Sequence, residues 1–288
     1  MRLATIPWHG ETSAALAEGD GFAPVRALAG REDAADVLSL IHRPLSADEV
    51  GELRSQLSAG PDVRLLPPIT RPPKNLLCVG KNYVEHVREG AEAEGVTFEV
   101  PKAPIWFTKP HTAMVGSGAP VVHDAAFTRA LDYEGELGVV IGTGGRGIAA
   151  DRALEHVFGY TIVNDITARD QQQRRNQWFV GKAADGYAPC GPWVVTADEI
   201  ADPQALQIRT EVDGEVRQED TTANMIFDVR TLIADLSEAL TLEPGDIIAT
   251  GTPPGVAWAS GRYLEPGSSV AVTVEGVGTL WNRVVTAS

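Results

Sequence analysis

Two glutamates separated by one residue, Glu134 and Glu136, stand in the segment LDYEGELGVVIG. The residues after them have the apolar character of a strand, on which side chains at i and i+2 point to one face. Two neighbouring carboxylates repel each other unless they share a proton, contact water or bind a cation. Asp165 adds a third carboxylate at the end of FGYTIVND. Three carboxylates from two strands would suit one Mg²⁺ or Mn²⁺, and the alternative is a solvated strand face.

His86 and Glu89 lie three residues apart in the segment NYVEHVREG. On a helix, side chains at this spacing are neighbours. A carboxylate bonded to one ring nitrogen fixes the tautomer and raises the basicity of the other nitrogen, as a general base requires. A histidine–glutamate pair on an exposed helix face would show the same spacing.

Three cationic side chains are candidates for binding an anionic substrate. Arg169 stands four residues beyond Asp165, Lys182 follows QWFVG, and Lys109 lies in FTKPHTAM. Each could bind a carboxylate or a developing oxyanion, but each could equally neutralise neighbouring acids or serve a structural role.

Two glycine-rich segments have features of anion or nucleotide sites. The loop after DIIAT, with Thr252 in GTPPG, offers N–H groups and a hydroxyl that could receive an anion. It has neither the lysine nor the spacing of a P-loop, and GTGGRG at 142–147 opens no helix pattern. Neither segment predicts a nucleotide site.

The composition narrows the class of protein. The 288 residues carry a formal net charge of −15, which argues against a nucleic-acid partner. No apolar run approaches the ~20 residues that cross a bilayer, and the N-terminus lacks the apolar core of a signal peptide. The two cysteines, Cys78 and Cys190, are far apart and indicate neither a disulfide framework nor a zinc site. We expect a cytoplasmic enzyme without a membrane partner.

The chain is predicted to divide near a proline-rich segment, PPITRPPKN. Residues 1–66 read as a small α/β domain in which LATIPW pairs with FAPVRALAG. Ser46 and Glu49 form a capping-box pattern that would open a helix through about Leu57. Residues 67–288 are expected to form the catalytic domain.

Strand patterns dominate after residue 75, and we predict a β-rich α+β fold. Hairpin turns are expected at Asp213-Gly214 and at Gly276–Gly278. Asn82 is the expected N-cap of a short helix through about Glu89, and residues 226–240 have helical spacing. The predicted strands are NLLCVG, PIWFTK, GELGVVIG, FGYTIVND, GPWVVT, LQIRTEV, DIIAT and SVAVTVEG.

Across about residues 72–284 the chain resembles the fumarylacetoacetate hydrolase family. The resembling segments are CVGKNYVEHVREG, FTKPHTAMVG, DYEGELGVVIG, GYTIVNDITARDQQ, FVGKAADGYAPCGPWVV and LEPGDIIATGTPPGV. The resemblance implies a mixed β-sheet roll or barrel core with a small N-terminal domain, and a homodimer. It makes Glu134, Glu136 and Asp165 the ligands of one Mg²⁺ or Mn²⁺ per chain, and His86 with Glu89 a water-activating pair.

The resemblance also assigns the positions that hold the substrate carboxylate or stabilise an oxyanion. These are Arg169, Gln172, Lys182 and Thr252. Fumarylacetoacetases proper carry a further metal-binding aspartate ahead of the histidine, and CVGKNYVEH has none. The chain is therefore more similar to the smaller acylpyruvase-type members.

We expect hydrolysis of a C–C bond in an acylpyruvate-like 2,4-dioxo acid, such as fumarylpyruvate, to pyruvate and a carboxylic acid. The same site would suit an oxaloacetate decarboxylase or a hydroxymuconate-type isomerase or decarboxylase. A non-catalytic metal-binding oligomer is the alternative of another class.

Overall fold

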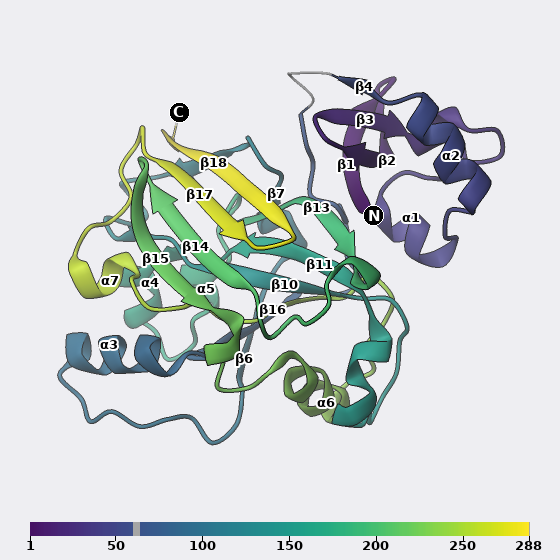
Figure 1. Cartoon of the computed structure of the whole chain (residues 1–288). Coiled ribbons are helices and arrows are strands. Elements are labelled where there is room, and N and C mark those ends of the chain that lie inside the picture. Colours follow the sequence, from purple (N-terminus) through teal and green to yellow (C-terminus); the bar gives the residue numbers. More distant parts are fainter. Residues whose placement is uncertain (60–63, 288) are drawn as a thin grey trace.

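The computed structural model describes residues 1–59 and 64–287 and shows a β-rich α+β fold, as expected (Figure 1). A long mixed sheet runs in the order β4-β3-β2-β1-β13-β11-β10-β16-β5-β6, with β7 paired to β13. Its strands are β1 Arg2–Trp8, β2 Glu11–Glu18, β3 Gly21–Pro24, β4 Ser58–Ala59, β5 Leu76–Gly80, β6 Ile105–Lys109, β7 Met114–Val115, β10 Gly135–Ile141, β11 Val157–Asn164, β13 Ala188–Thr196 and β16 Ile247–Ala249.

A second sheet of five strands packs against the middle of the first, and a two-stranded ribbon lies beside the candidate site. The second sheet has the order β15-β14-β17-β18-β8. Its strands are β8 Pro120–His123, β14 Gln207–Val212, β15 Glu215–Thr221, β17 Ser269–Val274 and β18 Gly278–Thr286, and the ribbon pairs β9 Leu131–Asp132 with β12 Thr167–Ala168. All eight strands predicted after residue 75 are confirmed, as are both hairpins.

Seven α-helices surround the sheets within the described residues. They are α1 Val37–His42, α2 Ala47–Ser55, α3 Val84–Glu94, α4 Arg169–Gln173, α5 Phe179–Lys182, α6 Val229–Ala239 and α7 Ala257–Ser260. The helical spacing of residues 226–240 is confirmed by α6, which begins after Asp228 because that side chain accepts a hydrogen bond from the N–H of Thr231. None of the described helices is both long and apolar enough to span a membrane.

The predicted pairing of LATIPW with FAPVRALAG is wrong, because an unpredicted strand, β2, lies between them. Its sequence, ETSAALAE, is rich in alanine and gives little strand signal. His9 and Gly10, with φ angles of 46° and 84°, form the tight turn that joins β1 to β2.

Asn82 is not the N-cap of α3, which starts after Tyr83 and runs to Glu94, beyond the expected end at about Glu89. The amide of Asn82 donates instead to the carbonyl oxygens of Phe227 (3.0 Å) and Thr250 (2.8 Å). A side chain used for these tertiary contacts cannot also cap the helix.

The N-terminal strands continue the central sheet, because β1 pairs antiparallel with β13. Leu3, Leu16 and Leu53 belong to the same buried cluster as Cys78 and Val163 of the central strands. The division into residues 1–66 and 67–288 stays a prediction, and residues 60–63 near that boundary, together with residue 288, lie outside the described residues.

The capping box at the start of α2 is confirmed, and it is tied to a buried arginine. The Glu49 carboxylate accepts from the N–H of Ser46 (2.7 Å) and from Nε and Nη2 of Arg31 (2.6 Å each). Arg31 is 3% exposed and also donates to the carbonyl oxygens of Arg43 and Pro44. The hydrogen bond from Arg31 lowers the pKa of Glu49 to about 2.

We expect Glu49→Gln to lower the free energy of unfolding at pH 7 by about 1–2 kcal/mol, because charge-assisted bonds to a half-exposed carboxylate are lost. A depressed pKa stabilises the fold above the usual value of 4.5, and this contribution is lost as the pH falls toward 2. Urea unfolding of both proteins should therefore show a difference that narrows below about pH 4.5. A difference that is constant from pH 7 to pH 4 would contradict the ion-pair account.

Candidate active site

The three predicted metal-binding carboxylates meet in the interior. Glu134, Glu136 and Asp165 each offer an oxygen, and these oxygens lie within 4.8 Å of one another. The three residues are 5%, 1% and 0% exposed. A solvated strand face is thereby excluded as the explanation of their spacing.

The pairing of β10 with β11 explains why these acids converge. Gly135 at the start of β10 is opposite Asn164 at the end of β11, and the N–H of Asp165 donates to the carbonyl of Glu134 (2.8 Å). The glycine between the glutamates is required by packing, since a Cβ there would lie 2.3 Å from Oγ1 of Thr210 in the second sheet. The sheet contact thus fixes the Glu-Gly-Glu pattern.

The environment of Glu136 leaves its negative charge poorly compensated. Burial raises the pKa of Glu136 well above its usual value, and the charges of Asp165 and Glu134 raise it further. The N–H of Gly251 donates to its Oε2 (2.8 Å), the only hydrogen bond to this carboxylate among the described residues. A bound cation would relieve the repulsion.

The environment of Glu134, in contrast, compensates its negative charge. Burial alone would raise the pKa of Glu134, but the charges of Lys182, Arg169 and His86 lower it below its usual value. Glu134 is therefore a carboxylate at neutral pH.

The donor set fits a hard divalent cation. All three candidate ligands are carboxylates, and Mg²⁺ and Mn²⁺ prefer oxygen. Three protein ligands would leave coordination positions for water or for a chelating substrate. The acidic cluster is thus suited to a divalent metal site.

Two of the predicted cationic residues are paired with the acids. Lys182, 2% exposed, donates to Oε2 of Glu134 (2.8 Å) and Oδ2 of Asp165 (2.6 Å). Arg169 donates from Nε to Asp132 (2.8 Å), and its Nη2 lies 2.6 Å from Oε1 of Glu134. They therefore neutralise the acids as well as line the cavity described below.

Lys109 lies behind the acids. Its ammonium group donates to Oδ1 of Asp165 and to the carbonyl of Ile166 (2.9 Å), and its side chain is fully buried. It is not among the cavity-lining residues. In this structure Lys109 orients a candidate metal ligand, and direct substrate binding by it stays a prediction.

His86 and Glu89 form the expected pair on α3. Nδ1 of His86 lies 2.8 Å from Oε1 of Glu89, and because a carboxylate can only accept, the ring donates from Nδ1. The other oxygen of Glu89 accepts from the N–H of Gly255 (2.9 Å). Glu89 is thus fixed between the helix and the GTPPG loop, and Nε2 of His86 stays available.

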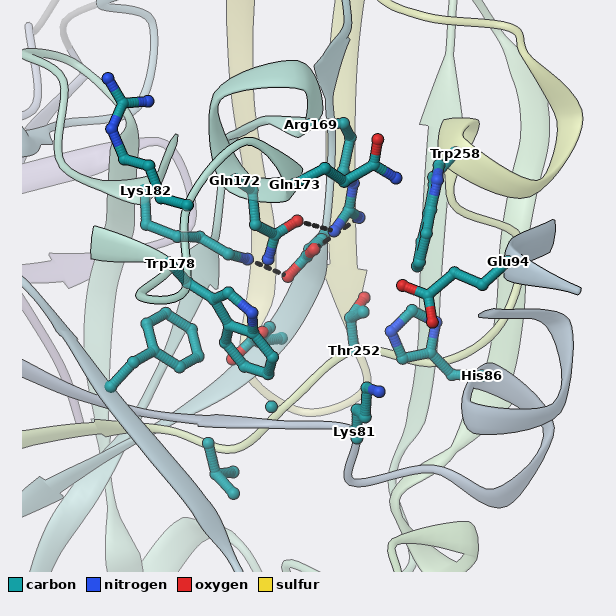
Figure 2. A pocket seen from close by; sticks show the side chains of 16 residues that line it. Lys81, His86, Glu94, Arg169, Gln172, Gln173, Trp178, Lys182, Thr252 and Trp258 are labelled. Atoms are coloured by element: carbon teal, nitrogen blue, oxygen red, sulfur yellow. Dashed lines mark hydrogen bonds and ion pairs between the residues drawn. The ribbon is translucent and has the colours of Figure 1, made fainter. Parts of the chain in front are cut away.

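A cavity of about 450 Å³ is lined by two of the acids and by His86 of this pair, whereas Asp165 and Glu89 lie behind its lining (Figure 2). Of the predicted site residues, those that line it are His86, Glu134, Glu136, Arg169, Gln172, Lys182 and Thr252. Gln172 accepts from Nη1 of Arg169 (3.1 Å). The hydroxyl of Thr252 already donates to the carbonyl of Gly135 (3.0 Å) and accepts from Gln218 (2.8 Å), so its contact with a substrate stays a prediction.

Sequence reasoning missed several residues around the cavity. Asp132 accepts from Arg169 and from the N–H groups of Ala257 (2.7 Å) and Trp258 (3.0 Å). It stands two residues before Glu134, so the i, i+2 spacing already used for the glutamates could have found it. Further residues that line the cavity without a local sequence signal are Lys81, Arg175 and Trp178, which lie outside helices and strands, and Trp258 of the short helix α7.

Comparison with known proteins places the chain in a family. Residues 75–285 match the family model described as fumarylacetoacetate (FAA) hydrolase C-terminal. The chain therefore belongs to the fumarylacetoacetate hydrolase family.

Individual relatives span the whole chain. An oxaloacetate tautomerase, YisK of Bacillus subtilis, is 43% identical over 99% of this chain and 89% of that protein. The crystallised fumarylacetoacetate hydrolase of Exiguobacterium antarcticum is 39% identical with a TM-score of 0.85, and all of each chain is covered. A maleylpyruvate hydrolase of Sphingobium sp. SYK-6, solved with manganese(II) and pyruvate, is 29% identical with a TM-score of 0.80, again over all of each chain.

Proposed function

We propose that this protein is a divalent-metal-dependent enzyme that interconverts the enol and keto forms of an oxaloacetate-like 2-oxo dicarboxylate. The observation that carries the proposal is that two members of a buried carboxylate triad, Glu134 and Glu136, line the same cavity as a glutamate-oriented histidine. The relative named oxaloacetate tautomerase, similar over nearly the full chain, supports this reaction over its rivals.

Glu134, Glu136 and Asp165 would hold the metal. Mg²⁺ or Mn²⁺ bound there would supply Lewis-acid stabilisation of the enolate charge. Lys182 and Arg169 keep Glu134 ionised, so this ligand is ready to bind a cation at neutral pH. The surrounding cationic side chains also favour an anionic substrate against the strongly negative net charge of the chain.

His86 would move the proton. In ketonisation, the imidazolium form gives its Nε2 proton to C3 of the substrate, and the C2–C3 double bond becomes a single bond. The enol hydroxyl releases its proton to solvent water as the C2 carbonyl forms, and the neutral imidazole takes a proton back from solvent. The reverse reaction takes a proton from C3. Glu89 stabilises the imidazolium and holds the ring orientation, and no water molecule is consumed.

Hydrolysis of an acylpyruvate remains the second candidate, because a histidine oriented by a carboxylate can also activate water. Attack of that water on the distal carbonyl would break the C–C bond and leave a carboxylic acid and pyruvate. Similarity to a maleylpyruvate hydrolase across the whole chain supports this reading.

Product analysis with one metal-loaded preparation separates the reactions. We expect faster decay of the enol absorbance of oxaloacetate, with little CO₂ released and no carboxylic acid released from acetylpyruvate or fumarylpyruvate. Release of the acid would establish the hydrolase, and CO₂ release that keeps pace with the loss of enol absorbance would establish a decarboxylase. Metal binding without any of these activities would favour the non-catalytic metal-binding oligomer.

A further inference from the structure

Lys81 lines the cavity and has an unusual backbone conformation. Its φ angle is 58°, in the left-handed region that a side chain with a Cβ rarely adopts. Only two other described non-glycine residues, His9 and Asp213, share this property, and both lie in hairpin turns. Lys81 lies in no hairpin, so turn formation does not explain it.

The neighbours of Lys81 impose this conformation. On one side, β5 pairs with β6 as far as Gly80, where a Cβ would lie 2.5 Å from the ring of Trp178. On the other side, the buried amide of Asn82 donates to Phe227 and Thr250 and accepts from the N–H of Phe227 (2.8 Å). The chain between these two anchors is fixed, so the strain at Lys81 is maintained by the fold.

The ammonium group of Lys81 has no hydrogen-bonding or ionic partner among the described residues. Lys182 and Arg169 form ion pairs with the acids, and Arg175 donates to Gln171 (2.8 Å). No hydrogen bond or ion pair within residues 1–59 and 64–287 engages the side chain of Lys81. In Figure 2 it lies on the side of the cavity where His86 and Thr252 are found, away from Gln172 and Gln173.

We propose that Lys81 binds the distal carboxylate of a 2-oxo dicarboxylate and so selects diacids over monoacids. This inference rests on the proposed function. If the C1 carboxylate and C2 oxygen face the triad and His86 reaches C3, the C4 carboxylate is one bond from C3 and must lie beside His86. Lys81 precedes the helix that carries His86 and offers the unpaired positive charge on that side.

The test compares two stable chelating acids that differ only in that carboxylate, malate and 2-hydroxybutyrate. Calorimetric titration of the Mn²⁺-loaded wild-type protein should show a preference for malate of about 10–100-fold, the range of a charge-assisted hydrogen bond. Lys81→Gly should remove the preference and leave the affinity for 2-hydroxybutyrate unchanged, whereas Lys81→Arg should retain it. Lys102→Ala, which removes an exposed lysine outside the cavity, is the matched control.

Thermal unfolding supplies a second readout. Because glycine adopts a positive φ without strain, Lys81→Gly should melt at the same or a higher temperature than the wild type. A lower melting temperature would assign Lys81 a structural role and overturn the inference. So would a malate preference that survives in Lys81→Gly, or equal binding of both acids by the wild type. If neither acid binds the wild-type protein, the result contradicts the proposed function, and with it the role of Lys81 that rests on that function.

Discussion

Glu136→Gln should weaken Mn²⁺ binding by at least ~100-fold and reduce turnover to background. Glu136 is a candidate ligand, and loss of even an outer partner of a metal ligand costs 10–100-fold in affinity. Calorimetry or the electron paramagnetic resonance of Mn²⁺ would measure the change. Equal Mn²⁺ affinity in variant and wild type would contradict the assignment of the metal site.

The thermal stability of the Glu136→Gln variant, with and without Mn²⁺, distinguishes loss of a metal ligand from misfolding. Burial and the neighbouring acids raise the pKa of Glu136, so its charged form is unfavourable without a cation. Metal-free Glu136→Gln should therefore be at least as stable as the metal-free wild type, and added Mn²⁺ should raise the melting temperature of the wild type only. Asp246→Asn is the matched control, since Asp246 is a buried acid paired with Lys74 outside the cavity.

His86→Ala should lower the rate of tautomerisation by about 10²–10⁴-fold, the usual contribution of a general acid–base group, with Mn²⁺ affinity unchanged. Glu89→Gln should lower the rate by a similar factor, because a neutral amide orients the Nδ1–H and stabilises the charge of the imidazolium less well than the carboxylate does. Steady-state kinetics on metal-loaded protein would measure both.

Glu85→Gln provides the control on the same helix. Glu85 pairs with Arg88 at the exposed surface and does not line the cavity. Its replacement should leave the kinetics unchanged. Near-native turnover in His86→Ala would show that another group moves the proton.

The acidic site could be predicted because its pattern is local. Glu134 and Glu136 follow strand periodicity, and Asp165 ends the neighbouring strand, so pairing of β10 with β11 was enough to bring them together. The helix spacing of His86 and Glu89 is equally local. Each of these patterns can therefore be recognised within one helix or between two consecutive strands of the sheet.

Other features depend on contacts that sequence patterns do not contain. Asn82 has the local pattern of an N-cap, yet the distant carbonyls of Phe227 and Thr250 take its amide. A lysine behind a ligand, Lys109, and a lysine facing the cavity, Lys81, look alike in sequence. The strand β2 was missed because its alanine-rich sequence gives little strand signal, and its pairing with β1 and β3 is a tertiary feature.

In the proposed reaction, His86, held on one side of the cavity, transfers a proton to one face of C3 of the substrate. The most direct test follows the ketonisation of enol oxaloacetate by the Mn²⁺-loaded protein in D₂O. Malate dehydrogenase and NADH convert the keto product to malate as soon as it forms. Proton NMR of the malate should then show deuterium at a single one of the two C3 positions, with the selectivity lost in His86→Ala. Accelerated ketonisation that places deuterium equally at both positions, or selectivity that persists in His86→Ala, would contradict the account.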